Sequence, residues 1–500
     1  MTTSRALERG VRSFYADLRA DPGAARVCRG TSCFLAGGAE LHPRVDAREA
    51  RGVYCLGFCD RSPAVLWPDG RVATGGSARA GAEGDADPPP PPVRCLARQA
   101  VVTERIARGD FSELARAREE GAYDALRAAL RERPERILDA LTRSGERGRG
   151  GGGFPTGVKW TRCAGVEAAE KFVVANGDEG DPGSFVDRIL LERDPHAILE
   201  GLALCALAVG AHQGVVYVRS EYPAAHARVR RALEEARGAG ILGPSVLGSG
   251  FAFDVRLASG HGSYVCGEET ALLNALEGRR GEVRLRPPYP VEAGLFGKPT
   301  VVNNVETLVN VPWILRRGPA AYRALGTRAS PGTKALCLNA GFERPGIVEV
   351  EFGESLRRVI EEEAGGGSGG ATLDAVALGG PMGSIVPREE WDVALDPAQL
   401  RERGIELGHG GLVALPRDTD WLALAEHWLC FMADESCGKC VPCRLGSQRA
   451  VEKVRDAAAR GDLLELLDTI AATSLCGFGQ GVPRPVIQLL ERVGGSREPR

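Results

Sequence analysis

The sequence predicts a multi-domain α/β protein, and three observations support this prediction. The chain has 500 residues, more than one hydrophobic core usually serves, so we expect several domains of roughly 100–200 residues each. Short apolar runs alternate with helical stretches through the middle of the chain, which is typical of a sheet covered by helices. Two sets of closely spaced cysteines lie near opposite ends of the chain, in segments of different character.

Composition excludes several classes of protein. Hydrophobic residues make up 43% and charged residues 26% of the chain, which is ordinary for a globular protein. No segment approaches the roughly 18 consecutive apolar residues of a membrane span, and the first twenty residues lack the apolar core of a secretory signal. We therefore expect a cytoplasmic protein with no direct membrane insertion. The formal net charge of −3 argues against a nucleic-acid partner, which usually shows as a basic stripe.

The domain boundaries follow from changes in composition. Residues 76–93 are rich in Gly, Ala and Asp, end in five successive prolines and have no apolar periodicity, so we expect a linker there. It follows a small cysteine-bearing module over 1–75. The pattern then predicts an α/β domain over 94–330, a small α+β domain over 331–415 and a helical domain over 416–500.

Within the α/β domain, three short apolar runs predict buried strands, at 171–176, 214–220 and 253–259. Residues 188–210 and 269–278 have the apolar spacing of helices. In the small domain, GTKALCLNAG and GIVEVEFG predict a pair of strands joined by a turn.

The glycine loop at 148–153 is the first candidate binding element. Gly148, Gly150 and Gly153 formally satisfy G-x-G-x-x-G, but a dinucleotide-binding loop should follow a strand and here the preceding residues are helical, so we reject that interpretation. The run of glycines, Gly151 among them, lets the backbone approach a ligand closely and point several N–H groups at it. Arg149 and Lys159 add positive charge suited to a phosphate, and Phe154 offers a flat apolar face. A flexible surface loop is the alternative.

Three further segments carry polar groups that a purely structural sheet does not need. Asn176, Asp178, Glu179 and Asp181 follow a predicted strand directly, and ligands of open α/β sheets bind at such strand ends. Glu268 and Glu269 begin a helix, where they either favour the helix dipole or accept hydrogen bonds from ribose hydroxyls. The paired amides of Asn303 and Asn304 suit a ligand ring. Each segment alone is explained by capping or turn chemistry; the combination indicates a ligand site.

The C-terminal cysteines predict a [4Fe–4S] cluster. Cys437, Cys440 and Cys443 follow one another at x2 spacings, and Cys476 supplies a distant fourth ligand. Three close thiolates and one remote thiolate suit a cubane cluster. A zinc site is the alternative, although zinc ribbons usually supply two separated C-x2-C pairs.

The N-terminal cysteines form two pairs, Cys28 with Cys33 and Cys55 with Cys59. Two pairs fit a [2Fe–2S] centre, in which each iron needs two thiolates. Zinc and an empty, degenerate module are the alternatives. Disulfides are not expected in a cytosolic chain.

These motifs together resemble the family of the flavin-carrying, NADH-oxidising subunit of respiratory complex I, and in particular its soluble relatives. The resemblance runs from about residue 120 to 492 and takes in GRGGGGFPTGVKW, NGDEGDPGSF, CGEETALLNALEG, GLFGKPTVVNNVETL, ALGGPMG and ESCGKCVPC in that order. It implies an FMN-binding α/β domain, a β-grasp-like domain over 331–415 and a helical iron–sulfur domain. The N-terminal module is similar to the cysteine-bearing part of a thioredoxin-like [2Fe–2S] subunit.

The resemblance also implies roles for individual residues. Those expected to contact FMN are Gly148, Gly150, Lys159, Asn176, Asp178, Tyr264, Gly267, Asn303, Asn304 and Thr307. Those expected to hold NAD(H) are Phe154, Glu179, Asp181, Glu269 and Tyr289, with Phe154 and Tyr289 stacked on the adenine. Glu179 is expected to tune the flavin or shape the nicotinamide pocket.

The implied function is hydride exchange between NAD(H) and FMN, followed by relay of single electrons through iron–sulfur clusters to or from a partner. No other substrate site is visible, so we expect catalytic and iron–sulfur partner subunits in a larger oxidoreductase complex. The fused N-terminal module favours an NAD-dependent formate dehydrogenase. The diaphorase subunit of an NAD-reducing hydrogenase is the first alternative, and a flavin-free electron-relay or scaffold subunit is the second.

Overall fold

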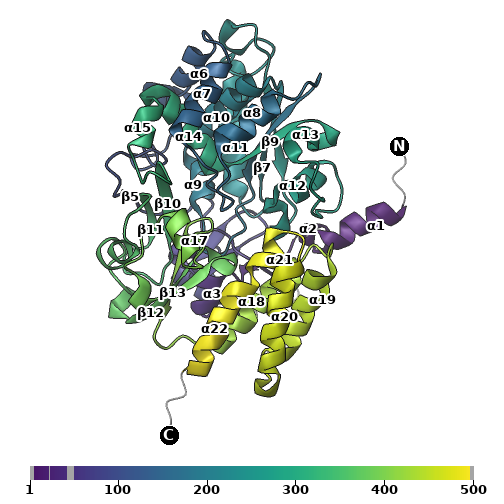
Figure 1. Ribbon diagram of the computed structural model, residues 1–500, viewed down its shortest axis with the longest axis vertical. Coiled ribbons are helices and arrows are strands. Elements are labelled where there is room, and N and C mark those ends of the chain that lie inside the picture. The colour runs from purple at the N-terminus through teal and green to yellow at the C-terminus, as the bar shows by residue number, and fades with distance from the viewer. Residues whose placement is uncertain (1–4, 22, 42–49, 496–500) are drawn as a thin grey trace.

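The computed structural model describes residues 5–21, 23–41 and 50–495, and it confirms a multi-domain α/β architecture. Three separate sheets and a C-terminal group of helices succeed one another along the chain (Figure 1). No helix within the described ranges is both long and apolar enough to span a bilayer.

The N-terminal module is built on a four-stranded sheet in the order β2-β1-β3-β4. Strands β1 and β2 are parallel, whereas β3 and β4 continue the sheet as an antiparallel pair. Two helices, α1 and α2, precede the sheet and α3 follows β1. The bounds are α1 Arg5–Phe14, α2 Ala16–Arg19, β1 Ala25–Cys28, α3 Thr31–Leu35, β2 Ala50–Val53, β3 Ala64–Leu66 and β4 Val72–Thr74.

The central domain is a parallel sheet in the order β8-β7-β6-β9, covered by helices. The three predicted strands are all present. The predicted helical stretch 188–210 is divided at Asp194, whose side chain accepts a hydrogen bond from the N–H of Ala197 and starts a new helix. The principal bounds are α7 Glu135–Ser144, α8 Thr156–Ala164, β6 Phe172–Gly177, α9 Val186–Arg193, α10 Pro195–Val209, β7 Gln213–Val218, α11 Pro223–Gly238, β8 Asp254–Ser259, α12 Glu269–Leu276, β9 Thr300–Asn304 and α14 Val305–Arg317.

The third sheet has six strands in the order β13-β12-β14-β10-β11-β5. The predicted strand pair is β10 and β11, which run antiparallel. Strand β5, which begins directly after the proline run, pairs with β11 and so ties the end of the linker to this sheet. The bounds are β5 Val93–Cys95, β10 Thr333–Leu338, β11 Gly346–Glu351, β12 Leu373–Leu378, β13 Ser384–Pro387, α17 Pro397–Glu402 and β14 Gly411–Pro416.

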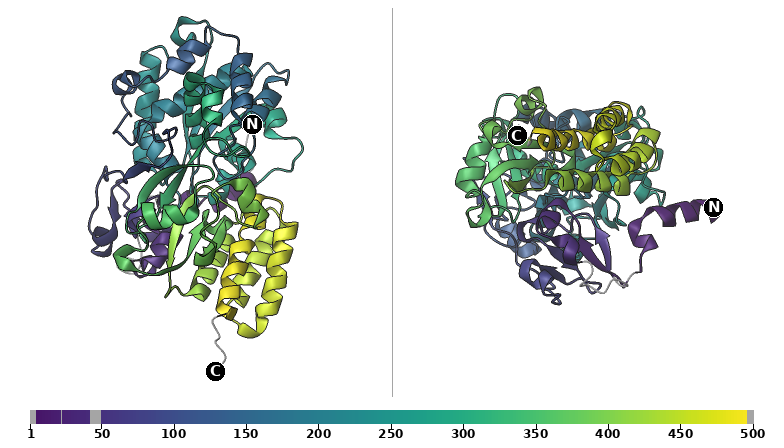
Figure 2. Two further views of the ribbon diagram at one scale, coloured as in Figure 1. Left: turned by 60° about the vertical axis from the view of Figure 1, so that its left-hand side comes forward. Right: turned by 90° about the horizontal axis from the view of Figure 1, so that it is seen from below.

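The C-terminal helices pack side by side around a buried apolar core that includes Trp428, Leu467 and Leu489 (Figure 2). Figure 1 shows them as the yellow end of the chain, beside the third sheet. The bounds are α18 Trp421–Glu435, α19 Val441–Lys453, α20 Arg460–Thr473, α21 Gly477–Gly481 and α22 Pro483–Gly495.

Two buried arginines join the N-terminal module to the central domain. Arg219 donates to the backbone carbonyls of Tyr54 and Cys55, at 3.1 and 2.9 Å, and also to the carbonyl of Glu179 at 2.9 Å. Arg188 donates to the carbonyl of Gly57 at 3.1 Å. Because buried guanidinium groups need partners, these contacts hold the second N-terminal cysteine pair against the central domain.

Candidate functional site

The main candidate site is a cavity of about 790 Å³ at the carboxyl ends of β6 and β9. Its walls come from the central domain, from the loop before β14 and from the segment after Cys476. Among the predicted site residues it is lined by Gly148, Gly150, Gly151, Phe154, Lys159, Asn176, Asp178, Glu179, Asp181, Tyr264, Gly267, Glu268, Glu269, Tyr289, Asn303, Asn304 and Thr307. Folding therefore brings together segments that lie up to about 160 residues apart.

The glycine loop lies against the Asn304 side of this cavity. A Cβ added at Gly150 would be 3.0 Å from the Cβ of Asn304, and Gly151 has a φ of +96° that L side chains rarely adopt. The N–H of Arg149 donates to the Thr307 hydroxyl at 2.9 Å. The backbone is thus fastened to α14 while its other N–H groups stay beside the cavity. The loop follows helix α7 rather than a strand, so rejecting the dinucleotide-binding interpretation was correct.

The two predicted basic side chains behave differently. Lys159 lines the cavity, and its Nζ contacts Glu269 at 3.2 Å and the carbonyl of Val302 at 3.0 Å. The guanidinium of Arg149 turns into the core instead, where it bonds Glu146 at 3.0 Å and lies 4.7 Å from the centre of the Phe352 ring. Arg149 is not among the residues that line the cavity, so its side chain does not face a ligand there.

The acidic segment after β6 forms one wall. The Glu179 carboxylate accepts hydrogen bonds from the N–H groups of Asp187 and Arg188, at 3.0 and 2.9 Å, at the start of α9. Burial nevertheless raises the pKa of Glu179 to about 7, and burial also raises the pKa values of Asp178 and Asp181. One carboxyl oxygen of each of those two aspartates is buried without a hydrogen-bond partner in the described residues.

Unpartnered buried oxygens beside glycine backbone are what a polar, planar ligand would satisfy. The backbone of Gly267 accepts a hydrogen bond from the Asn176 amide at 2.9 Å, and a Cβ at Gly267 would come within 3.1 Å of the Asp178 carbonyl. On the opposite wall, the Asn303 side-chain carbonyl accepts from the Trp160 indole at 2.8 Å, which leaves its amide N–H groups for a ligand. This donor set fits FMN.

Two aromatic side chains stand at the mouth of the cavity. Phe154 and Tyr289 are 44% and 47% exposed, among the most exposed large apolar side chains described. Arg286 lies near them and bonds both Glu268 and Glu269. Glu268 also caps α12, accepting from Thr270 and Ala271. Exposed aromatic faces beside carboxylates suit a nucleotide base and its ribose.

The C-terminal cysteines converge between α18 and α21. Cys443 opens α19, Cys476 precedes α21, and the positive φ of Gly438 (+78°) turns the chain between Cys437 and Cys440. Burial raises the pKa of Cys443 to about 12, so a bound metal is needed to hold it as a thiolate at neutral pH. Gly477 and Phe478, which follow Cys476 directly, line the main cavity. The cysteine site and the cavity therefore share a wall.

The N-terminal cysteines are all buried and lie as two pairs. The sulfur atoms of Cys55 and Cys59 are 3.6 Å apart. Cys33 is hydrogen-bonded to Cys28, a contact that contributes with burial to raising its pKa. In the described parts of the chain, no three cysteine sulfurs lie within 4.8 Å of one another. A tetrahedral zinc site with Zn–S of about 2.3 Å would hold all four sulfurs about 3.8 Å apart.

Several cavity residues escaped the sequence reasoning. Asp187 lies inside α9, and Met382, His409 and Phe478 come from segments far away in the chain. His409 lies in the glycine-rich stretch GHGG, which is the one local signal that could have drawn attention to it. The others carry no signal in the sequence, because only the packing of the third sheet and the C-terminal helices brings them to the cavity.

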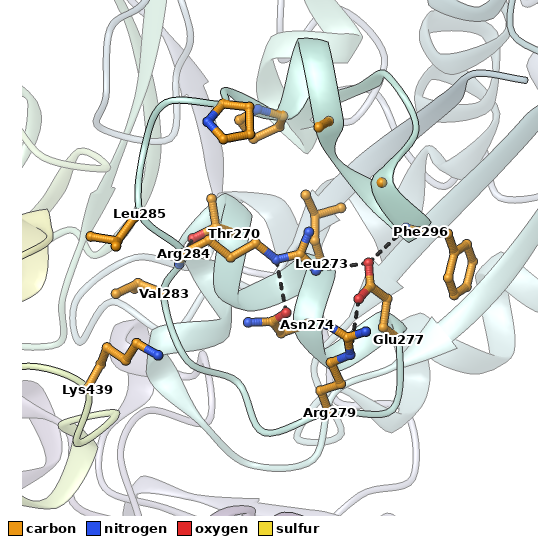
Figure 3. Close-up of a pocket in the computed structure, with 14 residues that line it drawn as sticks. Thr270, Leu273, Asn274, Glu277, Arg279, Val283, Arg284, Leu285, Phe296 and Lys439 are labelled. Atoms are coloured by element: carbon orange, nitrogen blue, oxygen red, sulfur yellow. Dashed lines mark hydrogen bonds and ion pairs between the residues drawn. The ribbon is translucent and has the colours of Figure 1, made fainter. Parts of the chain in front are cut away.

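A second cavity, of about 860 Å³, lies between α12 and the loop before β9 (Figure 3). Its charged side chains are bonded to their neighbours: Arg284 donates to Asn274 at 2.9 Å and contacts Glu277 at 2.9 Å. Glu277 also accepts from the N–H of Phe296 at 2.8 Å. It contains none of the predicted cofactor-binding residues, so the main cavity is the better candidate.

Two family models match the chain. The model of the Nuo51 FMN-binding domain matches residues 141–313, and the model of the NADH-ubiquinone oxidoreductase-F iron-sulfur binding region matches residues 423–495. The first range includes the glycine loop, the acidic segment and the asparagine pair. The second includes all four C-terminal cysteines.

Curated relatives and a solved structure agree with these matches. The NADH-quinone oxidoreductase F-subunit 2 of Rhizobium meliloti is 45% identical over 369 residues, which cover 72% of this chain and 88% of that protein. The HndC subunit of the NADP-reducing hydrogenase of Solidesulfovibrio fructosivorans is 42% identical over 384 residues, covering 75% and 78%. A chain in a crystal structure of NAD+-reducing [NiFe]-hydrogenase in the H2-reduced state superposes with a TM-score of 0.84 at 29% identity, covering 99% of this chain and 88% of that one.

Proposed function

Because this chain belongs to the family of the NADH-quinone oxidoreductase F-subunits, we propose that it exchanges hydride between NAD(H) and FMN in the main cavity and relays single electrons through its C-terminal [4Fe–4S] site. The observation that carries the relay is the shared wall: Gly477 and Phe478 line the cavity and directly follow the cluster ligand Cys476. Bound FMN supplies the chemistry, since it accepts two electrons as hydride and releases them singly. The protein binds, orients and shields the reacting rings.

The test of this function is cofactor analysis with an artificial acceptor. Purified under anaerobic conditions, the protein should be coloured, release FMN on denaturation, and reduce ferricyanide with NADH. A colourless preparation without extractable FMN would favour a flavin-free relay or scaffold subunit instead.

Phe154 and Tyr289 are proposed to hold the adenine of NAD(H) between them. We predict that Tyr289→Ala raises the KM for NADH roughly tenfold, because stacking of a base on an aromatic ring contributes about 1–3 kcal/mol. FMN content and kcat should stay near those of the native protein, since Tyr289 stands at the mouth of the cavity. Phe296→Ala is the matched control, because that ring is 55% exposed but lines the second cavity. An unchanged KM in Tyr289→Ala would remove the stacking role.

Glu179 is proposed to face the nicotinamide and flavin rings. We predict that Glu179→Gln keeps FMN bound but changes kcat for NADH, and that it flattens any pH dependence of kcat near pH 7. The physical reason is that burial raises the pKa of Glu179 to about 7, so the carboxyl gains its charge as the pH rises through neutrality. Glutamine has the same shape and cannot ionise. Steady-state kinetics from about pH 6 to 8.5 would check this; identical pH profiles would show that Glu179 does not act through its charge.

The N-terminal module is proposed to hold a [2Fe–2S] centre. Two close pairs of buried cysteines, rather than four equidistant sulfurs, suit a site in which each of two irons takes two thiolates. Iron and sulfide analysis with EPR of the reduced protein would test the proposal. Zinc in place of the second iron centre would overturn it.

The partner is proposed to be an NAD-dependent formate dehydrogenase, as the fused N-terminal module suggested. A second candidate is a hydrogenase, and one observation favours it: the NAD+-reducing [NiFe]-hydrogenase chain matches 99% of this chain, N-terminal module included. Metal analysis of the complex purified natively through this chain separates the two. Molybdenum or tungsten would support the formate dehydrogenase, and nickel would support the hydrogenase.

A further inference from the structure

His409 reaches the main cavity from a different domain than most of the residues around it. It lies just before β14 in the third sheet, is 8% exposed, and has no assigned role in the proposed reaction. Its Nδ1 is 3.6 Å from Oε1 of Glu179, and its Nε2 is 3.4 Å from Oδ2 of Asp187. Its Nε2 is also 3.3 Å from the side-chain nitrogen of Asn304.

The hydrogen bonds of Asn304 determine where the proton of His409 sits. The side-chain carbonyl of Asn304 accepts from the N–H of Glu306 at 2.9 Å, so its amide nitrogen is the atom that faces Asp187 and His409. An amide N–H can only donate, so Nε2 of His409 must accept. The neutral imidazole then carries its proton on Nδ1, which points at Glu179.

Other charges around His409 leave this arrangement intact. Lys334, on β10, is the nearest cation, and its ammonium group is bonded to Glu306. Burial, with Lys334 as a smaller contribution, lowers the pKa of His409 well below its ordinary value, which keeps the ring neutral. Asp187 has one buried oxygen without a partner in the described residues.

Glu179, Asp187 and His409 have the atom types of a divalent-metal site, with ligand atoms within 4.8 Å of one another. Two features argue against a metal there. The amide hydrogens of Asn304 point at Asp187 and His409, and both Glu179 oxygens already accept N–H groups of α9. A cation would meet donor hydrogens, so the cluster is better explained by hydrogen bonding and charge.

We propose that His409 is a positioning residue that orients Glu179 toward the flavin and reduces the negative field of its carboxylate at the flavin ring. This inference rests on the proposed function. The Nδ1–H faces the carboxylate, while Nε2 is held by Asn304, so the third sheet sets the electrostatics of a site that belongs to the central domain. Loss of the Nδ1–H exposes more carboxylate charge to the flavin and makes its reduction less favourable.

Two substitutions separate the two ring nitrogens. In His409→Asn the side-chain amide reproduces the N–H at the Nδ1 position, whereas in His409→Gln the amide reaches the Nε2 position and the donor to Glu179 is lost. We expect His409→Gln to lower the two-electron midpoint potential of bound FMN by about 30 mV, a tenfold change in the reduction equilibrium. We expect His409→Asn to stay near the native potential. His212→Gln, an exposed histidine far along the chain, is the control.

The experiment is an anaerobic spectroelectrochemical titration of the FMN-loaded protein, together with kcat and KM for NADH. The same His409→Gln change is then made in Glu179→Gln protein, where it should produce no further shift if His409 acts through that carboxylate. Equal potentials in native and His409→Gln protein, equal shifts in the Asn and Gln variants, or an undiminished shift in the Glu179→Gln background would each overturn the inference. Absence of FMN from the native protein would instead refute the proposed function.

Discussion

Replacing Cys440 with alanine should leave the flavin reaction intact and stop electron transfer to the partner. Cys440 is one of the four C-terminal cysteines and is only partly buried, so its removal takes a ligand from the cluster with little loss of core packing. We expect NADH–ferricyanide activity and FMN content close to native values. We expect reduction of the natural partner in the assembled complex to fall to background.

The matched control for this prediction is Cys430→Ala. Cys430 lies in the neighbouring helix α18, is also partly buried, and is not one of the four proposed ligands. It should transfer electrons to the partner at the native rate and keep the EPR signal of the reduced cluster. Partner reduction at the native rate in Cys440→Ala would show that electrons leave the flavin by another path.

Replacing Gly150 with leucine should produce a folded protein that contains no FMN. The Cβ alone would lie 3.0 Å from the Cβ of Asn304, and the rest of the side chain would occupy the cavity beside the asparagine pair. Because the ligand must approach this backbone closely, the loop cannot make room without losing its own contacts to α14. We expect a colourless protein with no NADH–ferricyanide activity.

Gly165→Leu is the control for the same substitution outside the cavity. At Gly165, just past α8, an added Cβ makes only ordinary contacts of 3.6 Å or more. That variant should bind FMN like the native protein. Circular dichroism and thermal unfolding would establish that Gly150→Leu is folded, and FMN bound at the native stoichiometry in this variant would show that the glycine loop does not cradle the flavin.

Helix boundaries and side-chain directions separate what local pattern could predict from what it could not. The buried strands β6, β7 and β8 were predictable, since each is a short apolar run between turn residues. The division of the helical stretch at Asp194 depends on a capping hydrogen bond together with Pro195. Arg149 was expected to face a phosphate, and its side chain instead enters the core because Glu146 and Tyr322 offer it buried partners.

Sequence alone determined the chemistry that neighbouring residues carry: the cysteine spacings, the glycine-rich backbone, and the carboxylates and amides placed at strand ends. These are properties of short segments, because spacing within a segment sets which groups can act together. Only the tertiary structure decided that the third sheet places His409 between Glu179 and Asp187, and that Cys476 and the main cavity share a wall. Those contacts join segments hundreds of residues apart, and they arise from the packing of whole domains, which no local pattern encodes.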